Sequence, residues 1–279
     1  MRFKLIALDV DGTLLNSERQ IGPRTKKALH DAVAAGIKIV LCTGRRYRSV
    51  LPIVDLLGIK PIVVVHGGAL VKDSQTHQTL YSHGLPHQLA QAVLGFLKYY
   101  DVSPLLILDT YPTGPDFIIE DDKKGKPEFL RYIEGAKGFY KVSKDFGGAP
   151  RDKMLEIALF SRMGTLADLL HRVKLEFRSR IEAHVLIFGH YRNRCDCLEI
   201  FNRRTSKWIA LMHVAQQMGI ADREIVAAGD DVNDIEMIQK AGFGIAMGNA
   251  RDELKEVADL VTGSYDDEGV ADFVEQILE

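Results

Sequence analysis

The sequence FKLIALDVDGT, residues 3–13, decides the fold prediction. Residues 3–8 are mostly apolar and predict a buried strand that runs directly into Asp9. Asp9 and Asp11 stand two residues apart at its end, so one carboxylate can act as a nucleophile and the other as an acid or base. Gly12 permits the tight turn that would aim both carboxylates at one centre. Without further clusters, the same pattern also fits a simple acidic turn.

Strands and helices alternate on both sides of a long middle section. Apolar runs at 37–42 and 61–65 predict strands, and the pattern at 23–35 predicts a helix between the first two strands. The alternation returns with a helix at 207–218 and a strand at 225–228. Such alternation predicts a parallel sheet with helices on both faces, a Rossmann-like α/β core built from both ends of the chain.

The middle section has a different pattern. Helical periodicity at 88–99 and 165–177 is mixed with short strand patterns, and Pro residues and polar breaks interrupt both. We therefore expect an α/β protein of two domains. Its core would comprise residues 1–83 and 197–279, and an inserted α+β domain would comprise residues 84–196.

The bulk properties exclude several classes of protein. The 279 residues carry a formal net charge of −2 with no long basic stripe, which argues against a nucleic-acid partner. No apolar stretch is long enough to span a bilayer, and three Cys do not form a disulfide framework. These features predict a soluble cytoplasmic protein without a membrane partner. The oligomeric state stays open between a monomer and a homodimer.

Three polar clusters each follow a predicted strand: Asp9-x-Asp11, Thr43-Gly44-Arg45 and the segment 229–234, GDDVND. Ligands of an open parallel sheet bind beyond the carboxyl ends of its strands, so these clusters should converge in space. The hydroxyl of Thr43 and the backbone N–H groups of this turn suit an anionic oxygen.

Two more residues complete this candidate site. Asp230 adds a hard oxygen ligand, and together with Asp9 and Asp11 it suits Mg²⁺. Lys207, at the start of a predicted helix, could neutralise phosphate charge and restrain the nucleophile.

The four motifs, in order, resemble those of the haloacid dehalogenase (HAD) superfamily of phosphatases. More narrowly, the chain is similar to the Cof-type subgroup, class IIB, which carries a large C2-type cap after the third strand. The matching residues are Asp9-Val10-Asp11-Gly12-Thr13, Thr43-Gly44-Arg45, Lys207 and Gly229-Asp230-x-x-Asn233-Asp234. The resemblance covers the predicted core by its motifs and the insertion by position and length.

The resemblance implies a mechanism. Asp9 would attack phosphorus and form an aspartyl-phosphate, while Asp11 would protonate the leaving alcohol and later activate water. The metal would be Mg²⁺, held by a carboxylate of Asp9, the backbone carbonyl of Asp11 and Asp230. The implied phosphate-binding residues are Val10, Thr43, Gly44, Lys207 and Asn233.

The implied reaction is hydrolysis of small phosphomonoesters, such as sugar phosphates or phosphorylated vitamin and nucleotide precursors. Two alternatives stay open at this point: a phosphomutase or phosphoryl transferase with the same nucleophile, and a non-catalytic module that binds a phosphorylated ligand. The sequence departs from the subgroup at His66-Gly67-Gly68 and at Trp208. The roles of these residues, and of Asp231, Asp234 and Asn249, are not assigned by the motifs.

Overall fold

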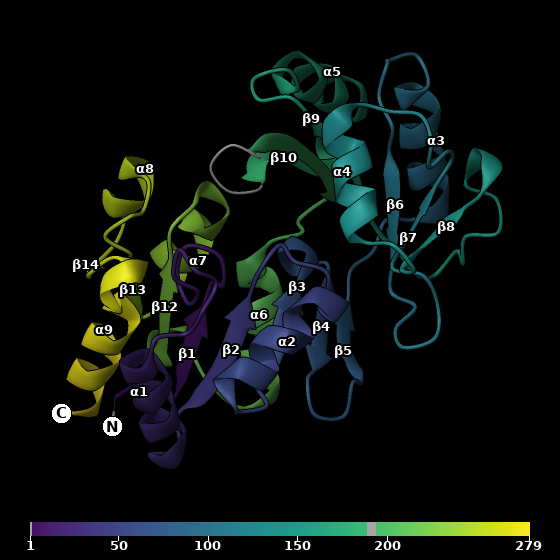
Figure 1. The fold of residues 1–279 in the computed structure, drawn as a ribbon. Helices are drawn as coiled ribbons and strands as arrows, with labels where there is room; N and C mark the ends of the chain where they lie inside the picture. The colour runs from purple at the N-terminus through teal and green to yellow at the C-terminus, as the bar shows by residue number, and fades with distance from the viewer. Residues whose placement is uncertain (1, 189–193) are drawn as a thin grey trace. The chain divides into compact units, whose positions relative to one another are not determined.

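The computed structural model describes residues 2–188 and 194–279, which fall into two compact units (Figure 1). The first unit comprises Met1–Ser82 and Ser206–Glu279, and the second comprises His83–Thr205. The second unit therefore ends at Thr205, later than the boundary at residue 196 expected from the sequence. The physical reason is strand β11 (Cys195–Asn202), which pairs on both sides within the sheet of the second unit.

The first unit is built on an eight-stranded sheet in the order β14-β13-β12-β1-β2-β3-β4-β5. The strands from β14 to β3 are parallel, and β4 and β5 continue the sheet as an antiparallel hairpin. The strands are β1 (Leu5–Leu8), β2 (Lys38–Cys42), β3 (Ile62–Val65), β4 (Leu70–Asp73), β5 (Thr79–Ser82), β12 (Ile225–Gly229), β13 (Phe243–Ala246) and β14 (Leu260–Val261). The predicted parallel α/β core is confirmed.

Helices cover both faces of this sheet, because the central strands are apolar apart from Lys38 at the start of β2 and must be buried on both sides. Helices α1 and α9 pack against each other on one face, and α6 and α7 pack against each other on the opposite face (Figure 1). The helices are α1 (Pro23–Ala34), α2 (Tyr47–Leu57), α6 (Lys207–Gln217), α7 (Ile235–Lys240), α8 (Asp252–Lys255) and α9 (Gly269–Leu278).

The second unit contains a six-stranded mixed sheet in the order β10-β11-β9-β6-β7-β8. Helices α3 and α5 bury one face of it in a cluster of apolar side chains, and α4 packs against β9. The elements are α3 (His87–Leu97), β6 (Leu105–Leu108), β7 (Phe117–Ile119), α4 (Pro127–Gly135), β8 (Tyr140–Val142), β9 (Met154–Ser161), α5 (Ala167–Phe177), β10 (Ile181–Phe188) and β11. The α+β character expected for the insertion is confirmed.

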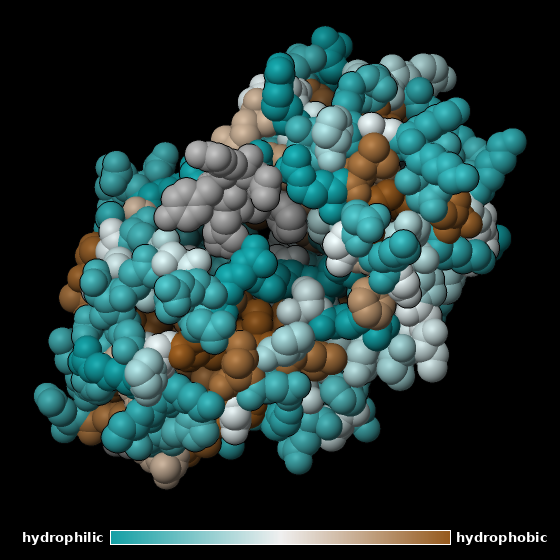
Figure 2. Space-filling model, viewed as in Figure 1, coloured by the Kyte–Doolittle hydropathy of each residue, from teal (hydrophilic) through white to brown (hydrophobic). Residues whose placement is uncertain are grey.

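Polar side chains cover much of the surface visible in Figure 2, with apolar patches between them. Among the described residues, no helix combines the length and the apolar character that a membrane crossing requires.

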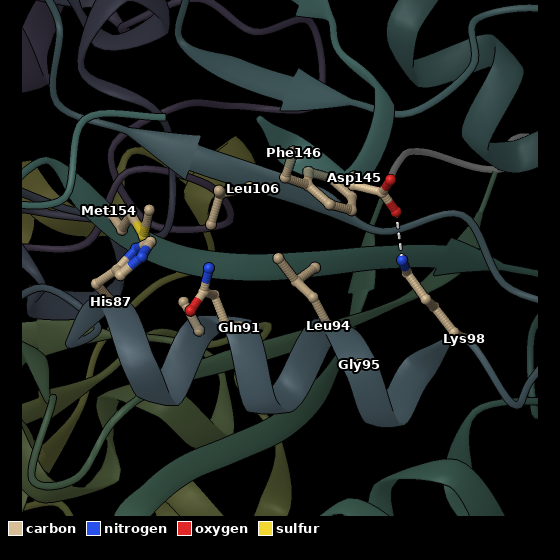
Figure 3. Close-up of a pocket in the computed structure, with 10 residues that line it drawn as sticks. His87, Gln91, Leu94, Gly95, Lys98, Leu106, Asp145, Phe146 and Met154 are labelled. Atoms are coloured by element: carbon tan, nitrogen blue, oxygen red, sulfur yellow. Dashed lines mark hydrogen bonds and ion pairs between the residues drawn. The ribbon is translucent and has the colours of Figure 1, made fainter. Parts of the chain in front are cut away.

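A cavity of about 200 Å³ lies inside the second unit, between α3 and the segment at Asp145 and Phe146. Leu94 of α3 points toward it, and an ion pair of 2.5 Å between Lys98 and Asp145 closes one end (Figure 3). Gly95 also lines this cavity, and a Cβ atom added there would meet no atom within 4 Å.

We therefore expect Gly95→Ala to stabilise the protein by about 1 kcal/mol, because Ala has the higher helix propensity and its methyl group, at an exposed position of α3, would clash with no atom. Denaturant unfolding followed by circular dichroism measures this change. Gly84→Ala in the same unit is the matched control. Its Cβ would lie 2.1 Å from the backbone oxygen of Met154, so it should destabilise the fold. A neutral or destabilising Gly95→Ala would contradict the assignment of free space at this helix.

Candidate active site

The site lies where three neighbouring parallel strands end. Strands β12, β1 and β2 are adjacent, and Leu8 of β1 pairs with Ala228 of β12. This register places Asp9, which follows β1, beside Asp230, which follows β12. The backbone N–H of Asp9 donates to the carbonyl of Ala228 at 3.0 Å and fixes the alignment. The structure thus brings the first and fourth sequence clusters together.

Gly12 makes this close approach possible. Its φ is +84°, and a Cβ atom at this position would lie 2.2 Å from Oδ2 of Asp230. The next residue, Thr13, donates its hydroxyl to Oδ1 of Asp230 at 3.2 Å. The amide of Asn249 donates to the carbonyl of Gly12 at 2.8 Å. The turn after β1 is therefore shaped around the Asp230 carboxylate.

Lys207 is a charged side chain buried at the centre of the site, only 2% exposed. It begins helix α6, whose start is fixed by Ser206 accepting a hydrogen bond from the N–H of Ile209. Its Nζ donates to Oδ1 of Asp9 at 2.7 Å and to Oδ1 of Asp234 at 2.6 Å. Burial by itself lowers the pKa of Lys207, but the carboxylates of Asp234 and Asp9 outweigh burial and hold the pKa above its usual value.

Asp234 belongs to the site, although the sequence left open whether it merely capped a helix. It is fully buried, and its Oδ2 accepts the backbone N–H groups of Asp230 and Asp231, both at 3.2 Å. Its position four residues after Asp230 was the indication in the sequence, because one short helical turn can bring its side chain back to the end of the strand. Such spacing also fits an ordinary cap, so the pattern could not decide.

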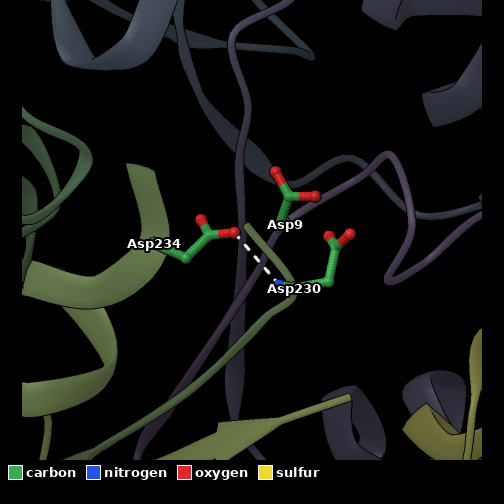
Figure 4. Close-up of side chains that lie close together, drawn as sticks. All are labelled: Asp9, Asp230 and Asp234. Carbon is green, nitrogen blue, oxygen red and sulfur yellow. Dashed lines mark hydrogen bonds between the residues drawn. The ribbon is translucent and has the colours of Figure 1, made fainter. Parts of the chain in front are cut away.

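Asp9, Asp230 and Asp234 form a triad of carboxylates that could hold a metal ion (Figure 4). Each offers one oxygen, and these oxygens lie within 4.8 Å of one another. The ligand set expected from the sequence used the backbone carbonyl of Asp11. Among the described side chains, Asp234 is the third carboxylate of the group, and the carbonyl of Asp11 stays a predicted ligand.

The charges in this triad explain why a cation fits. Burial, together with neighbouring carboxylates, raises the pKa of Asp9 to about 7 in spite of Lys207. Burial and the charge of Asp9 raise the pKa of Asp230 to about 9. Three clustered carboxylates and one ammonium leave negative charge in a poorly solvated place, where ionised groups are costly unless they are paired. The oxygen donors are those that hard divalent cations prefer.

The carboxylate of Asp11 points to a different partner. Nε of Arg45 donates to Oδ2 of Asp11 and Nη2 donates to Oδ1, both at 2.5 Å. The side chain of Asp11 is 44% exposed and that of Arg45 is 25% exposed. Arg45, which the sequence analysis named only as part of the Thr43-Gly44-Arg45 motif, thus forms an ion pair with the predicted acid.

The predicted phosphate-binding residues surround the same strand ends. Thr43 is buried, and its Oγ1 accepts the N–H of Arg45 at 3.2 Å. Thr43 does not cap α2, because Arg46 occupies that position. The side chain of Val10 is fully buried, so only its backbone is available for a ligand. Gly44 follows Thr43, and Asn233 lies next to Asp234 in the turn Val232–Asp234. Their contacts with phosphate stay predictions.

The unassigned residues have structural partners. His66 is buried and follows β3 with a φ of 53°. Nearby, a Cβ on Gly68 would lie 2.1 Å from the carbonyl oxygen of Ser206, so the turn after β3 packs directly on the start of α6. Trp208 is also buried within α6.

Asn249 and Asp231 also have defined contacts. Asn249 bridges Gly12 and the N–H of Tyr265, and Arg251, not Asn249, caps helix α8. Asn249 therefore does not cap this helix. Asp231 caps the turn that follows it and pairs with Arg251 at 2.5 Å.

Comparisons with known proteins agree with this fold. The family model of haloacid dehalogenase-like hydrolases matches residues 6–274. The chain is 32% identical to the phosphatase YwpJ of Bacillus subtilis, over 99% of this chain and 100% of that protein. It is also 32% identical to the 5-amino-6-(5-phospho-D-ribitylamino)uracil phosphatase YwtE of the same organism, over 99% and 98% of the two chains. The solved structure of the HAD subclass IIB sugar phosphatase BT4131 superposes with a TM-score of 0.75 at 21% identity, covering 98% of each chain.

The chain therefore belongs to the haloacid dehalogenase-like hydrolases. It is a phosphatase of this family, and the membership of the haloacid dehalogenase superfamily expected from the four motifs is confirmed. In this fold the unit with the mixed sheet is the cap domain.

Removal of the Lys207 charge should destabilise the protein. Lys207→Met leaves Asp9 and Asp234 buried without their cation, which should cost about 3–5 kcal/mol in the free energy of unfolding. Lys60→Met is the control, because its ion pair with Asp55 is exposed and should be worth at most about 1 kcal/mol. Equal unfolding midpoints of the two variants would contradict the central role of the buried pair.

Protons and a divalent cation should compete for the triad. Asp9 and Asp230 have raised pKa values, so both hold protons in the acidic range and must release them when a cation binds. We expect Mg²⁺ to raise the melting temperature more at about pH 8.5 than at about pH 6. Differential scanning fluorimetry with and without the metal measures this difference, and Asp230→Asn should abolish most of it. A metal-induced shift that is independent of pH would be incompatible with this site.

Proposed function

We propose that the protein is a Mg²⁺-dependent phosphatase that hydrolyses small phosphomonoesters through an aspartyl-phosphate on Asp9. The observation that carries this proposal is the hydrogen bond between Lys207 and Asp9 beside the carboxylate triad. A lysine at 2.7 Å restrains one oxygen of Asp9, which leaves the other oxygen for attack on phosphorus. The same ammonium offsets the negative charge of an incoming phosphate.

The other residues of the site have roles in this proposal that match their positions. Asp11 donates a proton to the leaving oxygen and then removes one from water, as two carboxylates with separate roles allow. Thr43, Gly44 and Asn233 hold the phosphoryl oxygens at the strand ends. In this proposal the donors face the charge that develops on the phosphoryl group and stabilise it.

The metal in this proposal is Mg²⁺, and Asp9, Asp230 and the carbonyl of Asp11 are its proposed ligands, with Asp234 beside them. When bound, the metal neutralises phosphoryl charge and helps to orient the ester. Asp234 also fixes the Asp230 backbone and holds Lys207, so it supports the site whether or not it contacts the ion.

The substrate class follows from relatives and remains broad. YwtE is named for a phosphorylated ribitylaminouracil, a vitamin precursor. Phosphorylated sugars and vitamin or nucleotide precursors are therefore the esters that we propose for this chain. The cap domain is the proposed source of selectivity, because the strand-end residues of the core are suited mainly to phosphate.

Asp9→Asn should abolish turnover while the fold persists, because Asn keeps the shape of the side chain but cannot form the acyl phosphate. We expect kcat for p-nitrophenyl phosphate with Mg²⁺ to fall by at least about 10³-fold. Release of inorganic phosphate measures hydrolysis and separates it from transfer to a second alcohol. Asp55→Asn, at an exposed position of α2, should leave the rate unchanged. A wild-type rate in Asp9→Asn would exclude Asp9 as the nucleophile.

A further inference from the structure

Asp11 is held by a single described partner. Both of its carboxylate oxygens accept hydrogen bonds from the guanidinium of Arg45 at 2.5 Å, and no other described residue donates to them. At 44% exposure, an Asp side chain without this contact would be free to change rotamer in solvent. The orientation of Asp11 therefore depends on Arg45.

Arg45 is itself fixed by two backbone contacts. Its N–H donates to Oγ1 of Thr43 at 3.2 Å, and its carbonyl accepts the N–H of His66 at 3.1 Å. The first contact comes from the end of β2 and the second from the turn after β3. The backbone of Arg45 is thus held at the ends of β2 and β3, and its side chain in turn holds Asp11 on the turn after β1. His66, which the mechanism does not use, contributes to this support.

We propose that Arg45 is the positioning residue of Asp11, and that this pair allows the enzyme to hydrolyse phosphate esters of unactivated alcohols. This inference rests on the proposed function. The planar guanidinium makes two parallel hydrogen bonds, so one can open at the oxygen that carries a proton while the other keeps the carboxyl group oriented. A lysine, with a compact ammonium, cannot do both.

The chemistry makes this role measurable. A bond forms between an oxygen of Asp9 and phosphorus, the bond from phosphorus to the leaving oxygen breaks, and its electron pair goes to that oxygen. An alkoxide needs a proton from Asp11 as it leaves, which makes the neutral alcohol and the Asp11 carboxylate. p-Nitrophenolate is a stable anion and leaves without that proton. Misplacement of Asp11 should therefore slow the hydrolysis of alkyl esters selectively.

The test compares kcat/KM for glycerol 2-phosphate and for p-nitrophenyl phosphate in the full chain with Mg²⁺. Arg45→Ala should reduce the rate on the alkyl ester by roughly 10–100-fold more than on the aryl ester, within the range of general acid catalysis. Arg45→Lys keeps the charge but loses the paired hydrogen bonds, so its selectivity against the alkyl ester should lie between those of Arg45→Ala and wild type. Asp11→Asn should show at least the selectivity of Arg45→Ala.

Two controls separate positioning from general damage. Arg24→Ala removes an exposed arginine whose Nε and Nη2 pair with the two oxygens of Glu275 in the same unit, and should change neither rate. In the Asp11→Asn background, Arg45→Ala should add no further selectivity, because the two residues act as one device.

The outcomes are distinct. The positioning role is overturned if Arg45→Ala lowers kcat/KM equally for both esters, or for neither. It is also overturned if Arg45→Ala makes the Asp11→Asn variant still more selective for the aryl ester. A wild-type protein inert toward both esters would instead contradict the proposed function. Melting temperatures of the variants identify any loss of fold. If Arg45→Ala does not fold, the ratio of the two rates in Arg45→Lys tests the positioning role.

Discussion

The buried ammonium of Lys207, shared by Asp9 and Asp234, is the interaction on which the rest of the site depends. It joins three elements: the end of β1, the start of α6 and the turn after β12. Lys207 is 2% exposed, so its charge is stable there only because two carboxylates face it. In turn, the close carboxylates of Asp9, Asp230 and Asp234 need the charge of Lys207, and they favour the binding of a metal cation as well. The charged groups of the proposed phosphate site therefore also stabilise the packing of α6 against the sheet.

Much of this arrangement could be predicted from the sequence. Asp9, Thr43 and Asp230 each follow an apolar run, and the carboxyl ends of adjacent parallel strands share one edge of a sheet. Position along the chain was therefore enough to place them together. Asp234 could not be assigned, because a site residue and a helix cap have the same local pattern. Its role depends on the direction of its two oxygens, which only the folded turn determines.

The cap domain was less predictable for a related reason. Its strands β7 and β8 have three residues each and its helix α4 has nine, too short for a clear period. Strand β11 carries charged residues within an apolar pattern, and its assignment depends on pairing with β9 and β10 far along the chain. Local propensity records none of these contacts. The domain boundary near Thr205 therefore emerged only from the sheet register.

The insertion of the cap between two halves of the core also has a consequence for biosynthesis. Strand β1 pairs with β2 early, but its other edge waits for β12, and Lys207 meets Asp9 across 198 positions of sequence. Closing so long a loop is slow, and until then an apolar strand presents an unpaired edge that other chains can join. A cap that folds as its own compact unit shortens this effective loop. The cap domain, for which we propose a role in substrate selection, would then also limit aggregation while the core is incomplete.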